Sequence, residues 1–268
     1  MTIYEIAARY CTTRADVVRK IHTALDRLGQ SGFLSELQGQ LLAAVADEYR
    51  ADLILDLGTG AGNSAAVFSM ARPDAAVHTF DLEEGWPEAR RKLAMTRDNV
   101  TAHVGDLTAT DFTPIIGRSG AVVLFWDAHG FEVATHVLGH IMPLIADRRH
   151  IVICHDMSHV HFLPEMDYGG KPFWRGLSHY GSWPGATAMT VLGWTATNVD
   201  QIIPILDFCA RNQIEFSSFD TDIHLTRSKA EIDALGNQLG ILPLPAVHMG
   251  YFTMEAAGPR RFPAARHP

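Results

Sequence analysis

The chain has 268 residues, 47% of them hydrophobic, which is enough apolar material for the core of one large domain, and its formal net charge is -8. Its lysines and arginines form no stripe along the sequence, so we expect no binding to nucleic-acid phosphates. The three cysteines are widely spaced, which predicts neither disulfides nor structural zinc. The sequence shows neither a signal-peptide pattern nor an apolar run near the ~20 residues that span a bilayer, so we expect a cytoplasmic protein without a membrane partner.

Two amphipathic helices are predicted ahead of the first strand, so we interpret residues 1–50 as a helical cap. Apolar side chains recur at helical spacing over residues 14–28. A second helix follows Ser35, because Gln38 stands three residues later and completes a capping box. This second helix leads directly into the first strand.

Strand and helix patterns then alternate. Strands are predicted at 52–56, 76–81, 100–104, 120–126 and 150–155, and helices at 63–71, 86–94 and 132–146. This alternation predicts an α/β fold in which a doubly wound, mostly parallel sheet carries helices on both faces. In such sheets, ligands bind beyond the carboxyl ends of the strands.

The first strand leads into a glycine-rich turn. It runs from Asp56 through Gly58, Gly60 and Gly62 to a helix that opens at Asn63 and Ser64. Glycine permits positive φ and lets a ligand approach the backbone, and the N–H groups of the opening helix turn then face that ligand. The turn therefore predicts a nucleotide-like cofactor. NAD is disfavoured, because Asn63 occupies the position of the third glycine in the NAD fingerprint.

The phrase D-x-G-x-G-x-G resembles motif I of the class I S-adenosylmethionine (SAM) methyltransferases. Asp81 stands where that family places the acid that takes the ribose hydroxyls, with Glu83 as the second choice, and Gly105-Asp106 stands near the expected adenine. The resemblance implies a Rossmann-like, seven-stranded sheet whose antiparallel last strand lies beside the fifth. It implies that the following residues bind SAM: Asp56, Gly58, Thr59, Gly60, Gly62, Asn63, Ser64, Asp81, Leu82, Gly105, Asp106 and Asp127.

The rest of the predicted domain, residues 51–255, contains an aromatic- and histidine-rich insertion at 157–196. We interpret the insertion as a lid over the acceptor substrate, with packing on the surface or against a partner subunit as the alternative. Next come a helix opened by Asn198, strand-like segments at 213–219 and 222–226, a helix over 229–239 capped by Ser228 and Glu231, and a strand at 248–254. Residues 256–268 are expected to be a flexible tail.

Polar residues end the fourth and fifth strands. Asp127 and His129 follow one strand, and His155 and Asp156 close the other, so all four should converge in a doubly wound sheet. This set resembles the catechol-type, cephalosporin-hydroxylase-like and macrolide-sugar O-methyltransferases, which implies Mg²⁺ or Mn²⁺ on Asp127, His155 and Asp156. The sequence departs from those families at His155, where they have a carboxylate or amide, and at Gly130, where they keep a basic residue.

These residues predict a SAM-dependent methyltransferase that acts on a hydroxyl of a small metabolite. We assign His129 as the general base, because imidazole titrates near neutral pH, and we place Asp127 and His155 with it in the catalytic set. N-methylation, other chemistry on a SAM fold and a non-catalytic SAM-binding accessory role remain alternatives. Helices with a phrase like Gln38 to Leu42 resemble those that pack on the core, cover the cofactor or form dimer contacts in small-molecule O-methyltransferases, so a homodimer is expected.

Overall fold

The computed structural model describes residues 2–27, 34–82, 98–156, 201–220, 223, 226–245, 247–254 and 260–263. Several sequence predictions lie outside these residues. They are the helix at 86–94, Glu83, the insertion at 157–196, the Asn198 cap, most of the segment 222–226 and most of the tail.

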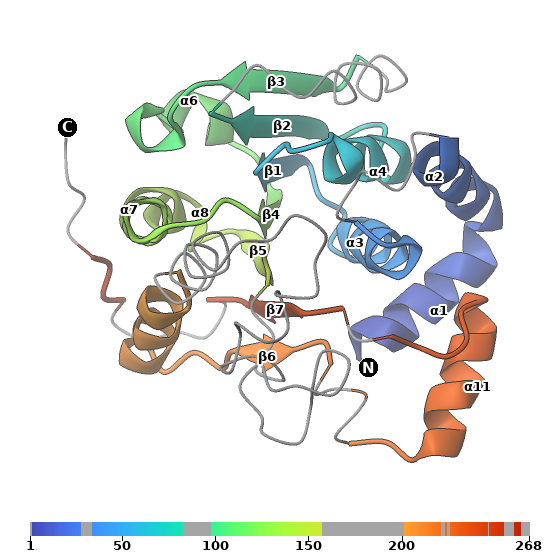
Figure 1. Ribbon diagram of the computed structural model, residues 1–268. Coiled ribbons are helices and arrows are strands. Elements are labelled where there is room, and N and C mark those ends of the chain that lie inside the picture. The colour runs from blue at the N-terminus through green and yellow to red at the C-terminus, as the bar shows by residue number, and fades with distance from the viewer. Residues whose placement is uncertain are drawn as a thin grey trace, which may run out of the picture.

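A seven-stranded sheet forms the centre of the molecule, with strand order β3-β2-β1-β4-β5-β7-β6 (Figure 1). The first five strands run parallel, whereas β7 runs antiparallel to both β5 and β6. The Rossmann-like topology and the place of the last strand beside the fifth are therefore confirmed. The strand bounds are β1 Leu53–Leu57, β2 Ala76–Asp81, β3 Val100–Val104, β4 Ala121–Trp126, β5 Arg149–His155, β6 Ser217–Ser218 and β7 Met249–Phe252.

Helices cover both faces of this sheet. Their bounds are α1 Ile3–Thr13, α2 Ala15–Arg27, α3 Glu36–Glu48, α4 Asn63–Ala71, α6 Thr113–Ile116, α7 Phe131–His136, α8 Met142–Ile145 and α11 Lys229–Leu239, with a further helical segment at 201–211. The sequence analysis gives no helix over α1, although Thr2 and Glu5 form a capping box at its start. Among the described helices, none is both long enough and apolar enough to cross a membrane.

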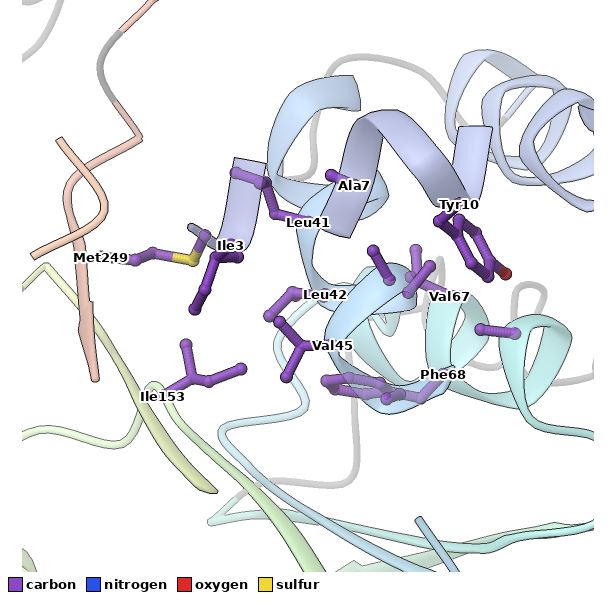
Figure 2. Packing of buried hydrophobic residues seen from close by; sticks show 14 of the residues in the cluster. Ile3, Ala7, Tyr10, Leu41, Leu42, Val45, Val67, Phe68, Ile153 and Met249 are labelled. Carbon is purple, nitrogen blue, oxygen red and sulfur yellow. The ribbon is translucent and has the colours of Figure 1, made fainter. Parts of the chain in front are cut away.

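The N-terminal helices belong to the main core. Ile3 of α1, Leu41 of α3 and Phe68 of α4 are buried in one cluster with Ile153 of β5 and Met249 of β7 (Figure 2). Helices α1 to α4 and α11 thus form the layer on one face of the sheet. The dimer contact expected of these helices stays a prediction.

A second cluster covers the opposite face. It joins Phe112 just before α6, Leu138 after α7 and Phe208 of the segment 201–211 to Trp126 of β4 and Phe252 of β7. Because apolar layers bury both faces of the parallel strands, β4 is apolar throughout, and all six of its residues are buried. The polar groups that follow β4 and β5 are therefore held at the end of a rigid sheet.

Two predicted elements differ from the structure. The helix predicted at 132–146 is interrupted by a π-helical turn, Val137–Ile141. Pro143 explains the interruption, because proline lacks an N–H group and its ring would clash with the carbonyl four residues earlier in a regular helix. The strand predicted at 213–219 is reduced to Ser217–Ser218, since the N–H of Ile214 still bonds the helical segment at Cys209.

Candidate active site

The glycine turn after β1 is pressed against the end of β4. Gly58 has φ +107°, and a Cβ added there would lie 2.7 Å from the carbonyl oxygen of Asp127. Gly60 also has positive φ, but open space surrounds its added Cβ. Gly58 is thus required by the contact between two strand ends, whereas Gly60 keeps the turn open toward a ligand.

Asp81, at the end of β2, holds this turn in place. Its Oδ2 accepts a hydrogen bond of 2.8 Å from the N–H of Gly60. The N–H groups of Gly58 and Thr59 donate to the carbonyl of Phe80, one residue earlier. The predicted ribose-binding acid therefore also fixes the backbone that would enclose the cofactor.

Two cavities meet at the turn. The larger, about 220 Å³, is lined by Gly58, Gly60, Phe80, Asp81, Leu82, Gly105, Asp106, Leu107, Asp127, Ala128 and His129. The smaller, about 40 Å³, is lined by Leu34, Gly58, Thr59, Gly60, Ala61, Asn63, Ser64, Phe125, Asp127 and His155. All the predicted cofactor residues except Asp56 and Gly62 line one cavity or both, and Asp127 borders the two.

Asp56 lies inside the fold and borders neither cavity. Its carboxyl is fully buried, and Oδ2 accepts a hydrogen bond of 2.7 Å from the hydroxyl of Thr79. The Thr79 hydroxyl has one hydrogen, which it donates to Asp56, so it accepts from the hydroxyl of Thr59 at 2.6 Å. Burial raises the pKa of Asp56 to about 7. Gly62, with φ +77°, is the N-cap of α4.

Four polar side chains converge beyond β4 and β5, which are adjacent and parallel. Nε2 of His129 lies 3.5 Å from Oδ1 of Asp127 and 3.8 Å from Oδ2 of Asp156. Nδ1 of His155 lies 3.1 Å from Oδ1 of Asp127 and 3.4 Å from Oδ1 of Asp156. Asp156 adopts φ +55°, a left-handed conformation that is uncommon outside glycine and recurs at functional sites.

Opposite charges shift the titration of this cluster. Burial raises the pKa of Asp127, but the neighbouring histidines outweigh burial and hold it below its ordinary value. The pKa of Asp156 is also lowered, since His155 outweighs burial. Burial lowers the pKa of His129, but the hydrogen bond with Asp127 and the charges of Asp127 and Asp156 together outweigh burial and raise it. The carboxylates are thus held ionised, as cation ligands must be.

The described residues contain one group with the spacing of a cation site. One ligand atom each from Asp127, His129 and Asp156 lie within 4.8 Å of one another. Two carboxylates and an imidazole form a donor set that suits Mn²⁺ well and Mg²⁺ less well. The set predicted from the sequence contained His155 in place of His129, and that assignment stays a prediction.

Two glutamines complete the site, and no motif identified their contacts. Nδ1 of His129 lies 2.6 Å from Oε1 of Gln201, and Nε2 of His155 lies 3.0 Å from Nε2 of Gln38. Both glutamines are buried. Gln38 was identified as the capping partner of Ser35 and as part of the family-like phrase Gln38 to Leu42. Neither signal indicated a contact with His155, which lies 117 positions along the chain.

Comparisons with known proteins agree with this architecture. No protein-family model and no curated protein matches the sequence. Among solved structures, the chain is similar to a Podospora anserina methyltransferase with bound S-adenosylhomocysteine (SAH), at 14% identity and a TM-score of 0.51, over 96% of this chain and 89% of that one. It is also similar to the O-methyltransferase TomG of Streptomyces achromogenes with bound SAM, at 19% identity and a TM-score of 0.44, over 75% and 81% of the two chains. The likeness to the Podospora anserina structure supports the Rossmann-like fold that the strand order shows.

Proposed function

We propose that the protein is a SAM-dependent methyltransferase that methylates a hydroxyl of a small metabolite with the help of a divalent cation. The strongest support is the position of Asp127, which borders both cavities and also belongs to the cation group. A single residue thus joins the wall of the methyl-donor site to the place where an acceptor would be activated. The similar Podospora anserina methyltransferase was solved with bound SAH, which supports a cofactor of this class.

The two cavities suit the two ends of SAM. We assign the adenosine end to the larger cavity, where Asp81 would accept from the ribose hydroxyls and Asp106 would meet the adenine. We assign the methionine end to the smaller cavity, where Asn63 and Ser64 open helix α4 and place its N–H groups near a carboxylate. The methyl group would then point toward Asp127.

The contacts of His129 favour a role as cation ligand in place of its predicted role as general base. With Nδ1 against the carbonyl oxygen of Gln201, His129 presents Nε2 toward Asp127 and Asp156. Metal-binding histidines usually donate their second N–H to such an oxygen, so we propose His129 as the cation ligand. A cation bound there would lower the pKa of an acceptor hydroxyl and orient it. His129 would then be unable to serve as the general base.

Transfer from labelled SAM to a panel of phenols, catechols, sugar alcohols and amines tests the proposal. We expect methylation of a hydroxyl compound, loss of turnover with a chelator, and recovery with Mn²⁺ or Mg²⁺. SAM affinity, measured by calorimetry, should not change with chelation. Methylation of amines alone would replace O- by N-methylation, and SAM binding without transfer to any acceptor would favour an accessory role. Failure to bind SAM would overturn the proposal.

A further inference from the structure

Gln38 occupies a position where its amide has no rotational choice. It is the third residue of α3, and its Oε1 accepts a hydrogen bond of 2.7 Å from the N–H of Ser35. Its Nε2 donates over 2.9 Å to the carbonyl of Val247. A backbone N–H can only donate and a carbonyl can only accept, so these two partners fix which end of the amide is oxygen.

Val247 is itself held firmly. Its N–H donates over 2.7 Å to the carboxylate of Asp220, which is fully buried and also accepts from the N–H of His248. The amide of Gln38 is therefore fixed between the start of α3 and the segment that leads into β7. Its second amide hydrogen points to Nε2 of His155, 3.0 Å away.

This contact determines where His155 carries its proton. A ring nitrogen that faces an N–H donor must accept, so Nε2 holds a lone pair and the proton of the neutral ring lies on Nδ1. Nδ1 is the nitrogen that faces Asp127 and Asp156, at 3.1 and 3.4 Å. Both oxygens there are acceptors. Nδ1 is buried and has no well-aligned hydrogen-bond partner, so its proton faces the carboxylates without completing a hydrogen bond to either one.

The alternative is a doubly protonated ring. Burial lowers the pKa of His155, and the carboxylates of Asp127 and Asp156 outweigh burial and raise it well above its ordinary value. Those carboxylates, however, face Nδ1, whereas a second proton would have to lie on Nε2. There it would oppose the amide hydrogen of Gln38 in a buried contact, which leaves two donors without an acceptor. The donor geometry therefore sets the tautomer of the neutral ring.

The other capping boxes show that a glutamine is not needed for the cap. In the described residues, α1 begins with Thr2 and Glu5 and α11 with Ser228 and Glu231, and both close the same pair of hydrogen bonds through a carboxylate. Only α3 uses glutamine, and it is the one whose capping side chain contacts the candidate site. A carboxylate at residue 38 would cap the helix but would accept at Nε2 of His155.

We propose that Gln38 is a positioning residue that holds His155 as the Nδ1–H tautomer. The Nδ1–H of His155 then faces the carboxylates of Asp127 and Asp156 and stabilises their charge beside the cation, and His155 is not itself a ligand. This inference rests on the proposed function for the role of the carboxylates, whereas the tautomer can be measured without it. Residues of this outer kind typically change metal affinity or activity by about 10–100-fold when they are replaced.

The test combines Gln38→Glu with Glu231→Gln, the reverse exchange in a capping box far from the site. Histidine ring nitrogens are observed by ¹⁵N NMR, with His155 assigned by comparison with His155→Gln. Wild type and Glu231→Gln should show an unprotonated Nε2 and a protonated Nδ1, and Gln38→Glu should show a protonated Nε2. Titration with Mn²⁺ should give affinity about 10–100-fold weaker in Gln38→Glu alone, with SAM affinity within twofold of wild type.

A protonated Nε2 in the wild-type protein would overturn the inference, and this measurement needs no variant that could fail to fold. Unchanged Mn²⁺ affinity in a folded Gln38→Glu protein would overturn it as well. Failure of the proposed function gives a different result, namely no SAM binding or no methyl transfer by the wild type, whatever tautomer His155 adopts.

Discussion

The β1–β2 end of the sheet and the β4–β5 end are built in different ways. At the first, the contacts lie close in sequence: Gly60 bonds Asp81, and Thr59 and Asp56 meet at Thr79. At the second, both histidines are oriented by glutamines from distant segments, Gln38 and Gln201. The first end thus depends on a local turn and the second on correct tertiary packing. Substitutions at the two ends should therefore fail in different ways.

The largest effect is expected at the β4–β5 end, from Asp127→Asn. The amide removes the charge that faces both His129 and His155, so cation affinity and turnover should fall together by at least about a hundredfold. Mn²⁺ titration and the methyl-transfer assay measure the two losses. Because the histidines hold the pKa of Asp127 below its ordinary value, the variant should also lose some stability at neutral pH, so both assays are run at a temperature at which it is folded. A variant that keeps full turnover would show that this end has no chemical role.

At the β1–β2 end, Gly58→Ala should act on folding. Its Cβ would meet the backbone of Asp127 at 2.7 Å and would also require φ +107°. We expect a loss of about 3 kcal/mol in the free energy of unfolding and failure to bind SAM. Gly60→Ala is the matched control, since nothing lies near its Cβ, and it should cost only about 1 kcal/mol. Equal losses in denaturant titrations would contradict this distinction.

This contrast also explains what the sequence could predict. The alternation of strands and helices and the glycine turn are local patterns, and they predicted the mostly parallel sheet and the turn. The place of the last strand beside the fifth came from the family resemblance. The cation group was predicted only in part, because the choice between His129 and His155 depends on partners 72 and 117 positions away. The π-helical turn depends on Pro143, which is a local signal that the periodicity of apolar residues overrode.

A smaller effect, confined to the β1–β2 end, concerns the pH dependence of stability. Burial raises the pKa of Asp56 to about 7, whereas an unfolded aspartate titrates near 4. Between these values the folded state binds the additional proton, so stability falls as pH rises through this range and levels off above 7. Asp56→Asn should remove this loss. The free energy of unfolding of the variant, relative to wild type, should therefore rise by about 2 kcal/mol from pH 5 to pH 7.

Paired urea titrations at pH 5, 6, 7 and 8 measure this difference. The comparison with wild type at each pH cancels the contribution of the other ionisable groups. A difference that is constant with pH would show that Asp56 is ionised in the folded protein throughout.

The last effect separates the two roles of Asp81, which bonds the turn and is proposed to bind the ribose. Asp81→Asn retains an oxygen for the N–H of Gly60, whereas Asp81→Ala removes that partner. We expect Asp81→Ala to weaken SAM binding by about tenfold to a hundredfold, which corresponds to charge-assisted hydrogen bonds of about 1.5–3 kcal/mol. Asp81→Asn should lose about threefold to tenfold, because its oxygen can serve the turn or one hydroxyl but carries no charge. Calorimetric titration with SAM and with 2′-deoxy SAM separates the roles. The wild-type protein should bind the deoxy compound more weakly than SAM, whereas each variant should bind the two compounds about equally. Equal sensitivity of all three proteins to the missing hydroxyl would assign the ribose to another acid and leave Asp81 with the turn alone.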